Sequence, residues 1–196
     1  MLNSFHKNVN NKIVLASQSY QRRALLNSIG IEPYKIVSPG IDESIFEKEN
    51  PRDYVLRVSE QKAKKFIKEY PKHIILAADT IVLCGSRIVD KTQDKDKAQK
   101  SLRLLSGRWH KVLSCVVLIK QKKVYHKKVL TRVRFKRLTS SEIKFYIETN
   151  EWIGKAGSYA IQGQASAFII EIKGSYSNVV GLPLYETLSL IGGVGL

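Results

Sequence analysis

Residues 74–84 read IILAADTIVLC, an apolar run with an acid near its middle. A continuous run of this kind is typical of a central strand that is buried on both faces of a sheet. A carboxylate inside such a strand costs several kcal/mol unless a cation, a metal or hydrogen bonds compensate it. The alternative is a strand that ends at Asp79 and meets solvent there. Because Ile81, Val82 and Leu83 continue the run beyond the acid, we predict that Asp79 is buried and functional.

The segment at residues 13–29 predicts a strand, a polar turn and a helix. Its first residues are apolar, Ser17 to Ser19 are polar, and the later apolar residues recur at helical spacing. Free backbone N–H groups at a strand-to-helix turn bind anions, so Ser17, Ser19 and Arg22 are candidate phosphate contacts. The turn is neither a GxGxxG nor a GxxxxGKS/T motif, and an ordinary helix N-cap explains the serines equally well.

A second helix is predicted from residue 50 to about residue 70, where an Asn-Pro pair supplies the cap and the first turn. Its apolar face carries Val55, Val58 and Phe66, and the helical period places Lys62 on the same face. Lys62 is therefore a candidate partner for the buried acid or for a phosphate. The alternative, in which its stem covers apolar surface while the ammonium reaches water, fits the spacing equally well.

Helices and strands alternate along the rest of the chain. A helix capped by Asp94 precedes strands at 112–119 and 124–138. A capping box at 139–142 begins another helix, and a strand at about 167–172 and a terminal helix follow. Because the two middle strands have the pattern of an antiparallel hairpin, the predicted fold is α/β, with a mixed twisted sheet flanked by helices.

The strand at 124–138 alternates between a face that we expect to be buried and a basic face. The first consists of Thr131, Val133 and Phe135, and the second of Arg132, Arg134 and Lys136. The basic ladder would suit a nucleic-acid backbone, but no aromatic platform is interleaved with it. A solvent-facing strand explains the ladder as well.

The composition of the 196 residues limits the class of protein. With 43% hydrophobic residues, the chain can bury one core or one core in two joined lobes. We expect a single domain at 13–196 behind a flexible tail at 1–12. Neither a membrane helix nor a signal peptide is recognised, so the expected location is the cytoplasm. Cys84 and Cys115 lie in apolar runs without disulfide or metal-site spacing, and we expect buried free thiols.

Charged residues outside the strands give weaker signals. The formal net charge of +16 favours contact with polyanions, but scattered lysine is more often a solvated surface. Glu43, beside Asp42, is a candidate Mg²⁺ ligand, although isolated acidic pairs in loops are usually only solvated. His110 has no neighbouring cysteine or acid in the sequence, so we expect it to be structural.

Several segments, taken together, resemble the motifs of one family. LASQSYQRRALL (15–26) resembles the Maf opening motif LASxSPRRxxLL, and AADTIV (77–82) resembles its ADTxV motif. LLSGRWHKV resembles the LSGxxHxV segment, and KAGSYAIQG and GSYSNVVGLPL resemble the two closing motifs. They follow the family's order from Ile13 to about Leu190, so the resemblance to the Maf family covers nearly the whole chain.

The resemblance implies an elongated, two-lobed Maf/ITPase-like architecture with a central cleft for the nucleotide. It implies a nucleoside triphosphate pyrophosphatase, in which water attacks the α-phosphorus and a divalent cation, Mg²⁺ or Mn²⁺, is the cofactor. Catalysis would involve Asp79, Lys62 and Lys91, with Asp79 as general base or metal-positioning acid and with Glu43 and Asp79 at the metal. The expected substrate contacts are Ser17, Ser19, Arg22, Thr80 and Gln162, of which Ser19 follows from its place in the turn.

Other expectations concern the substrate and the partners. Gln162 resembles the branch that acts on dTTP and UTP, whereas Tyr20 and Gln21 replace the proline and first arginine of the opening motif and weaken the assignment of a base. Thr92 also stands where a proline commonly follows Lys91. The same resemblance suggests a homodimer, and we expect no membrane contact and no obligatory nucleic acid. The alternative from another class is a basic nucleic-acid-binding or cell-division regulatory protein without catalysis.

Overall fold

The computed structural model describes residue 9 and residues 12–195. The strands are β1 (Ile13–Ala16), β2 (Lys35–Val37), β3 (Ile74–Cys84), β4 (Arg87–Val89), β5 (Trp109–Lys120), β6 (Lys123–Phe135) and β7 (Ile169–Lys173). The helices are α2 (Tyr20–Ser28), α3 (Pro51–Lys64), α4 (Lys95–Leu105), α5 (Ser140–Glu148), α6 (Tyr176–Val180) and α7 (Leu184–Gly193), with short 3-10 helices η1 (Ala156–Ser158) and η2 (Gln164–Phe168).

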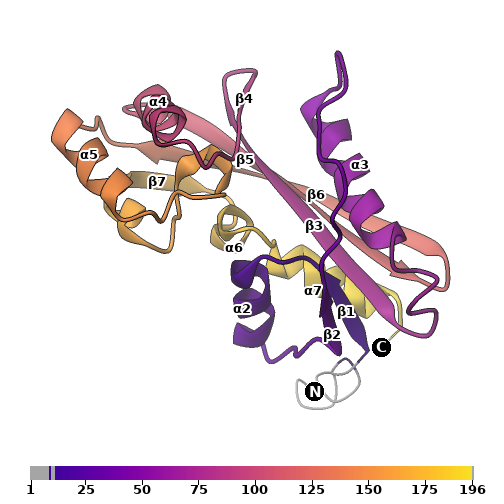
Figure 1. Cartoon of the computed structure of the whole chain (residues 1–196). Coiled ribbons are helices and arrows are strands. Elements are labelled where there is room, and N and C mark those ends of the chain that lie inside the picture. Colours follow the sequence, from indigo (N-terminus) through magenta and orange to yellow (C-terminus); the bar gives the residue numbers. More distant parts are fainter. Residues whose placement is uncertain (1–8, 10–11, 196) are drawn as a thin grey trace. The chain divides into compact units, whose positions relative to one another are not determined.

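These strands form one mixed sheet in the order β2-β1-β3-β5-β6-β7, with β4 paired to β3 (Figure 1). β1 is parallel to both β2 and β3, whereas the β3–β4 and β6–β7 pairs are antiparallel. Neighbouring strands β5 and β6 are joined by Gln121 and Lys122, which both have positive φ, as a two-residue hairpin turn requires. The prediction of an α/β fold with a mixed sheet and a hairpin is confirmed.

The chain divides into two compact units that are each built from separate segments. Unit 1 comprises Met1–Asp79, Ser114–Val129 and Gly181–Leu196, and unit 2 comprises Thr80–Leu113 and Leu130–Val180. The single domain at 13–196 stays a prediction. The expected tail at 1–12 lies largely outside the described residues, and within it Val9 is buried in the core of unit 1.

In unit 1, helices cover both faces of the sheet. One core cluster joins Leu76 and Ala78 of β3 to Leu26 of α2 and Ile191 of α7. On the other face lies α3, whose Ser59 Oγ donates a hydrogen bond to Cys115 O on β5 at 3.0 Å. Successive side chains of a strand point to opposite faces. The residue after Ala78 therefore points toward α3.

In unit 2, one face of the sheet packs against α4 and α5. The core cluster here takes Ala98, Leu102 and Leu105 from α4, Ile143 and Tyr146 from α5, and Val133 and Phe135 from β6. Thr131, Val133 and Phe135 are fully buried, whereas Arg132 and Arg134 are exposed. The predicted alternation of a buried and a basic face along β6 is confirmed.

The predicted elements are present, but some bounds differ: β5 begins at Trp109 rather than Val112, and β6 ends at Phe135 rather than Leu138. Asp94 caps α4, and Thr139 with Glu142 forms the capping box of α5, as predicted. The helix expected to reach residue 70 ends at Lys64, because the N–H groups of Phe66 and Ile67 then bond three residues back rather than four. The short elements β2, β4 and α6 were not predicted, since three to five residues are too few to show a period.

No helix among the described residues is long and apolar enough to cross a membrane. Cys84 and Cys115 are free thiols, as expected. Cys115 is buried, but Cys84 is only partly buried, because it is the last residue of β3, next to the turn into β4.

Candidate functional site

Asp79 is the centre of the candidate site. Its side chain is fully buried on β3, so the alternative in which the acid meets solvent is wrong. Asp79 Oδ1 lies 2.8 Å from Lys62 Nζ, which comes from the apolar face of α3 and is itself only 4% exposed. The alternative, in which the alkyl chain of Lys62 carries the ammonium group to solvent, is therefore wrong. The predicted pairing of Lys62 with the buried acid is confirmed.

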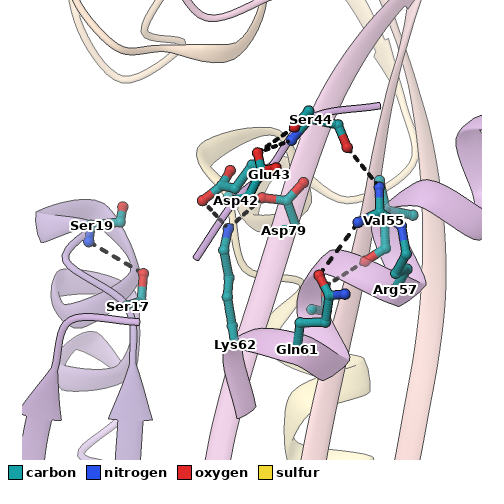
Figure 2. A network of polar contacts seen from close by, with 12 residues as sticks. Ser17, Ser19, Asp42, Glu43, Ser44, Val55, Arg57, Gln61, Lys62 and Asp79 are labelled. Atoms are coloured by element: carbon teal, nitrogen blue, oxygen red, sulfur yellow. Dashed lines mark hydrogen bonds and ion pairs between the residues drawn. The ribbon is translucent and has the colours of Figure 1, made fainter. Parts of the chain in front are cut away.

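Glu43 completes a triad of charges. Its Oε1 lies 2.8 Å from the same Lys62 Nζ, so one ammonium contacts two carboxylates (Figure 2). The side chain of Glu43 is 38% exposed, which leaves it accessible to a ligand from solvent. Glu43 is therefore part of a built cluster rather than a solvated loop acid.

The loop that carries Glu43 is fixed to α3 by several contacts. Tyr54 Oη donates to the backbone oxygen of Glu43 at 2.9 Å. Arg57 donates to both carboxylate oxygens of Glu49, at 2.6 and 2.7 Å, and to Ser44 O at 2.8 Å. Its guanidinium also lies 3.8 Å from the ring centroid of Phe46. This bidentate anchor holds the loop in place although it has no regular secondary structure.

The turn between β1 and α2 forms a second polar group within unit 1. Ser19 is the N-cap of α2, and its Oγ accepts a hydrogen bond from Arg22 N at 3.4 Å. Arg22 is buried, and its Nη1 donates to Ser17 Oγ at 3.1 Å while its Nε donates to Gly181 O at 2.9 Å. Ser17 Oγ also accepts from Ser19 N at 3.2 Å (Figure 2). Both serines therefore have local partners, as expected of a cap, and they also fix the arginine.

The turn and the charge triad are electrostatically coupled. Burial lowers the pKa of Arg22 from its usual value, while the negative charges of Asp79 and Glu43 act in the opposite direction. A guanidinium remains protonated in proteins, so Arg22 adds a permanent buried cation to the cluster. Unit 1 thus collects Ser17, Ser19, Arg22, Glu43, Lys62 and Asp79, which are six of the predicted site residues.

The carboxylates of this cluster fit a divalent cation that is completed by other ligands. Mg²⁺ binds through one or two carboxylates together with water and substrate phosphates. Glu43 and Asp79 supply two carboxylates that converge on one atom. Among the described residues, no group of three or more His, Cys, Asp or Glu side chains could hold a metal by itself. Any metal here would therefore need oxygen ligands from solvent or from a bound phosphate.

The other predicted residues, Thr80, Lys91 and Gln162, belong to unit 2. Thr80 is buried and follows Asp79 directly along β3. Lys91 is exposed just after β4, and Gln162 is exposed in the turn before η2. Their roles remain predictions.

His110 has the structural place that we expected. It is buried in unit 2, where its Nε2 lies 2.8 Å from Tyr159 Oη and its ring packs edge-on against Phe135. Burial lowers its pKa to about 4. The imidazole is therefore neutral at physiological pH.

Two features of the site were missed by sequence reasoning. Gly181 O accepts from a side chain 159 residues earlier, and no local pattern marks that contact. The loop anchor formed by Arg57 and Glu49 was also missed, although an arginine on the second turn of a helix next to an acidic loop is a recognisable signal.

Comparison with known proteins places the chain in one group. The family described as Maf-like protein matches residues 12–194. The chain belongs to the Maf family. A relative from Ehrlichia ruminantium (strain Gardel), named nucleoside triphosphate pyrophosphatase, is 48% identical over 91% of this chain and 94% of its own length.

Two further relatives are named dTTP/UTP pyrophosphatase. The protein from Wolbachia sp. subsp. Drosophila simulans (strain wRi) is 45% identical over 92% of each chain. The protein from Chelativorans sp. (strain BNC1) is 46% identical over 94% of this Maf chain and 91% of its own. Among solved structures, the Staphylococcus aureus Ham1 protein aligns over 93% of this chain and 98% of its own at 12% identity. Its TM-score of 0.49 is too low to add to the fold assignment.

Proposed function

We propose that this protein hydrolyses nucleoside triphosphates to nucleoside monophosphates and pyrophosphate. Its relatives in the Maf family carry the name of this activity at 45–48% identity over more than nine tenths of the chain. The observation that carries the proposal is the contact of Lys62 with both Asp79 and Glu43, beside the buried Arg22. None of these relatives is named as a non-catalytic nucleic-acid-binding or division-regulating protein.

The cluster has the charges that this hydrolysis requires. Water adds to the α-phosphorus, the bond from that phosphorus to the bridging oxygen breaks, and pyrophosphate leaves with the negative charge. Catalysis of such a step depends mainly on positioning and on electrostatic stabilisation of the phosphate oxygens. Arg22 and Lys62 supply cations, and α2 begins next to Arg22, where the positive end of a helix favours a phosphate. Lys91 is proposed as a further cation for the triphosphate.

Asp79 is proposed to orient the attacking water. Its buried carboxylate is held by Lys62, so its position is set by α3 rather than by solvent. Glu43 and Asp79 would hold Mg²⁺ or Mn²⁺ together with the phosphates. Such a cation would neutralise charge that develops on the phosphate oxygens. Asp79 would act either as the general base for the water or as an acid that positions the metal.

The proposed substrate class is dTTP, UTP and modified pyrimidine nucleotides. Two of the relatives named above are dTTP/UTP pyrophosphatases, and an amide such as that of Gln162 can both donate to and accept from a base edge. Thr80 is proposed as its companion. A homodimer and a cytoplasmic location also remain part of the proposal.

Replacement of the central acid tests the function. Purified protein should release pyrophosphate from dTTP or UTP with Mg²⁺ or Mn²⁺, and Asp79→Asn should lower the rate by about 1,000-fold, as for loss of a general base. Glu60→Gln is the matched control, because Glu60 pairs with Lys64 on the outer side of α3. It should retain full activity.

Circular dichroism and thermal melting of each variant show whether the fold is intact. Asp79→Asn leaves Lys62 its contact with Glu43, so we expect a folded protein. Wild-type protein that releases no pyrophosphate from any nucleoside triphosphate would refute the proposed function. A folded Asp79→Asn protein with full activity would refute the proposed site.

A further inference from the structure

Trp109 of β5 lies among cations on the sheet of unit 2. The guanidinium carbon of Arg132 is 4.9 Å from its ring centroid, and Lys173 Nζ is 5.2 Å from the same ring. Arg132 and Lys173 are partners in the register of β6 and β7. Three neighbouring strands thus bring one aromatic ring and two cations together.

The same face of the sheet carries more positive charge. Lys111 follows two residues after Trp109 on β5, and Arg134 follows two residues after Arg132 on β6, so both point to this face. Arg132, Arg134, Lys111 and Lys173 are exposed, and Glu171 lies 3.2 Å from Lys173.

The intervening residues point the other way. His110 and Val112 of β5 and Val133 and Phe135 of β6 are all buried on the face that packs against the helices of unit 2. The cationic face is therefore distinct from the packed face, and its side chains do not build the core.

We propose that this face, formed by Trp109, Lys111, Arg132, Arg134 and Lys173, binds single-stranded nucleic acid. Surfaces that bind single strands combine cations that follow the phosphates with aromatic rings on which bases stack. An arginine beside a tryptophan adds a second planar group for stacking. The net charge of +16 draws polyanions toward the whole protein, but only a site with an aromatic platform distinguishes bases from bare phosphates.

The position of Trp109 explains one feature of the sequence. The ladder Arg132, Arg134 and Lys136 has no aromatic platform of its own, because Phe135 is buried on the opposite face and the platform comes from another strand. Trp109 is 23 positions earlier in the chain and reaches the ladder only through the pairing of β5 with β6. Lys136 instead forms an ion pair with Glu142 of α5, so it is not included in the proposed face.

Fluorescence anisotropy with a labelled 20-mer of thymidine, in EDTA and at several salt concentrations, tests the proposal. Arg132→Ala/Arg134→Ala should weaken binding at least about 10-fold and reduce the slope of log K against log salt by about 1.4, as expected for two lost contacts with a single strand. Trp109→Leu should weaken binding by roughly 10-fold and leave that slope unchanged.

Two matched controls separate this face from general attraction by charge. Lys123→Ala/Lys127→Ala removes two exposed cations from the part of β6 that lies in unit 1, and should have less than about one third of the effect on the slope. An abasic oligonucleotide of equal length carries the same phosphates, and wild-type protein should bind it roughly 10-fold more weakly than the thymidine strand. Trp109→Phe, which keeps an aromatic ring, should retain most of the wild-type affinity for the thymidine strand.

Several results of these binding measurements would overturn the proposal. Equal binding of the abasic and thymidine strands, or equal losses for the two double variants, would overturn the proposal in favour of non-specific attraction. Absence of binding at low salt would also overturn it. Pyrophosphate release from dTTP should be unchanged in every variant of this face, so the result does not depend on whether the proposed enzymatic function holds.

Discussion

The two units bury polar groups of different kinds. In unit 1 the buried polar residues include the ions Arg22, Lys62 and Asp79, whereas the buried polar residues described in unit 2 are neutral, with His110 and Asn178 among them. Buried ions require partners and usually add little net stability, since desolvation offsets their attraction. Neutral hydrogen-bonded groups can be purely structural. The difference supports the proposal that unit 1 retains its ions for chemistry.

The neutral pairs of unit 2 fix a segment that contains a predicted substrate contact. Tyr159 is held by His110, and Tyr146 Oη accepts a hydrogen bond from Ala160 N at 2.9 Å. Just before them, Gly157 has φ of 70°, and an added Cβ would lie 2.8 Å from Val82. These contacts determine the path of the chain up to Gln162. Unit 2 therefore uses buried polar groups to position an exposed side chain.

The largest expected effect is a loss of stability in acid, caused by the buried neutral His110 of unit 2. His110 has a pKa of about 4 in the folded protein, against about 6.5 when unfolded. Between these values the unfolded state binds more protons, so stability is complete above about pH 6.5 and falls as the pH drops toward 4. The loss amounts to about 3 kcal/mol, which is more than 100-fold in the unfolding equilibrium.

Urea denaturation at pH 7, 5.5 and 4.5 measures this dependence. His110→Gln removes the titrating group. As the pH is lowered from 6.5 toward 4, the free energy of unfolding of this variant should therefore fall less steeply than that of the wild type, by about 1.4 kcal/mol per pH unit. The matched control is His126→Gln, which replaces an exposed histidine and should keep the wild-type dependence. Identical pH dependence in His110→Gln and wild type would refute the assigned cause.

At Arg22, the shape of the guanidinium group should matter more for activity than its positive charge. Arg22→Lys keeps the cation but cannot reproduce the two diverging bonds to Ser17 Oγ and Gly181 O. We expect about a 100-fold loss in kcat/KM for pyrophosphate release, since a misplaced group near the chemistry has an effect of this order. Arg23→Lys, at the exposed neighbouring position, is the control and should leave the rate unchanged. A fully active Arg22→Lys enzyme would show that any cation suffices.

The smallest effect is expected at Gln162. Because its side chain is exposed, Gln162→Ala should leave the melting temperature unchanged. If it contacts the base, the ratio of kcat/KM for dTTP to that for CTP should change by about 10-fold, as for loss of one hydrogen bond. Gln164→Ala, also exposed two residues later, should leave the ratio unchanged. An unchanged ratio in Gln162→Ala would show that the Gln162 side chain does not select the base.

Local patterns were sufficient to predict the parts of the site that lie on regular elements. Asp79 and Lys62 were both recognisable as charges on apolar faces, and the structure pairs them. Caps at Asp94 and Thr139 were also predictable, since each depends on residues within one turn.

Contacts between distant segments could not be predicted in this way. The partner of Arg22 lies 159 positions away, and the ring beside Arg132 comes from the preceding strand. The hairpin itself was predicted, but the positive φ of Gln121 and Lys122 was not, because neither residue is the glycine or asparagine that positive φ usually favours. Each of these features depends on tertiary structure or on strand pairing, which short windows of sequence do not specify.

The two cysteines are separate internal probes for opening of the two units. Burial raises the pKa of the Cys115 thiol to about 12, so the reactive thiolate is scarce in the closed state of unit 1. An alkylating reagent should modify Cys115 only after local or global opening. Cys84, which is partly buried, belongs to unit 2. Time-resolved mass spectrometry of the unmodified sequence would therefore follow each half separately, without an added label or an engineered residue.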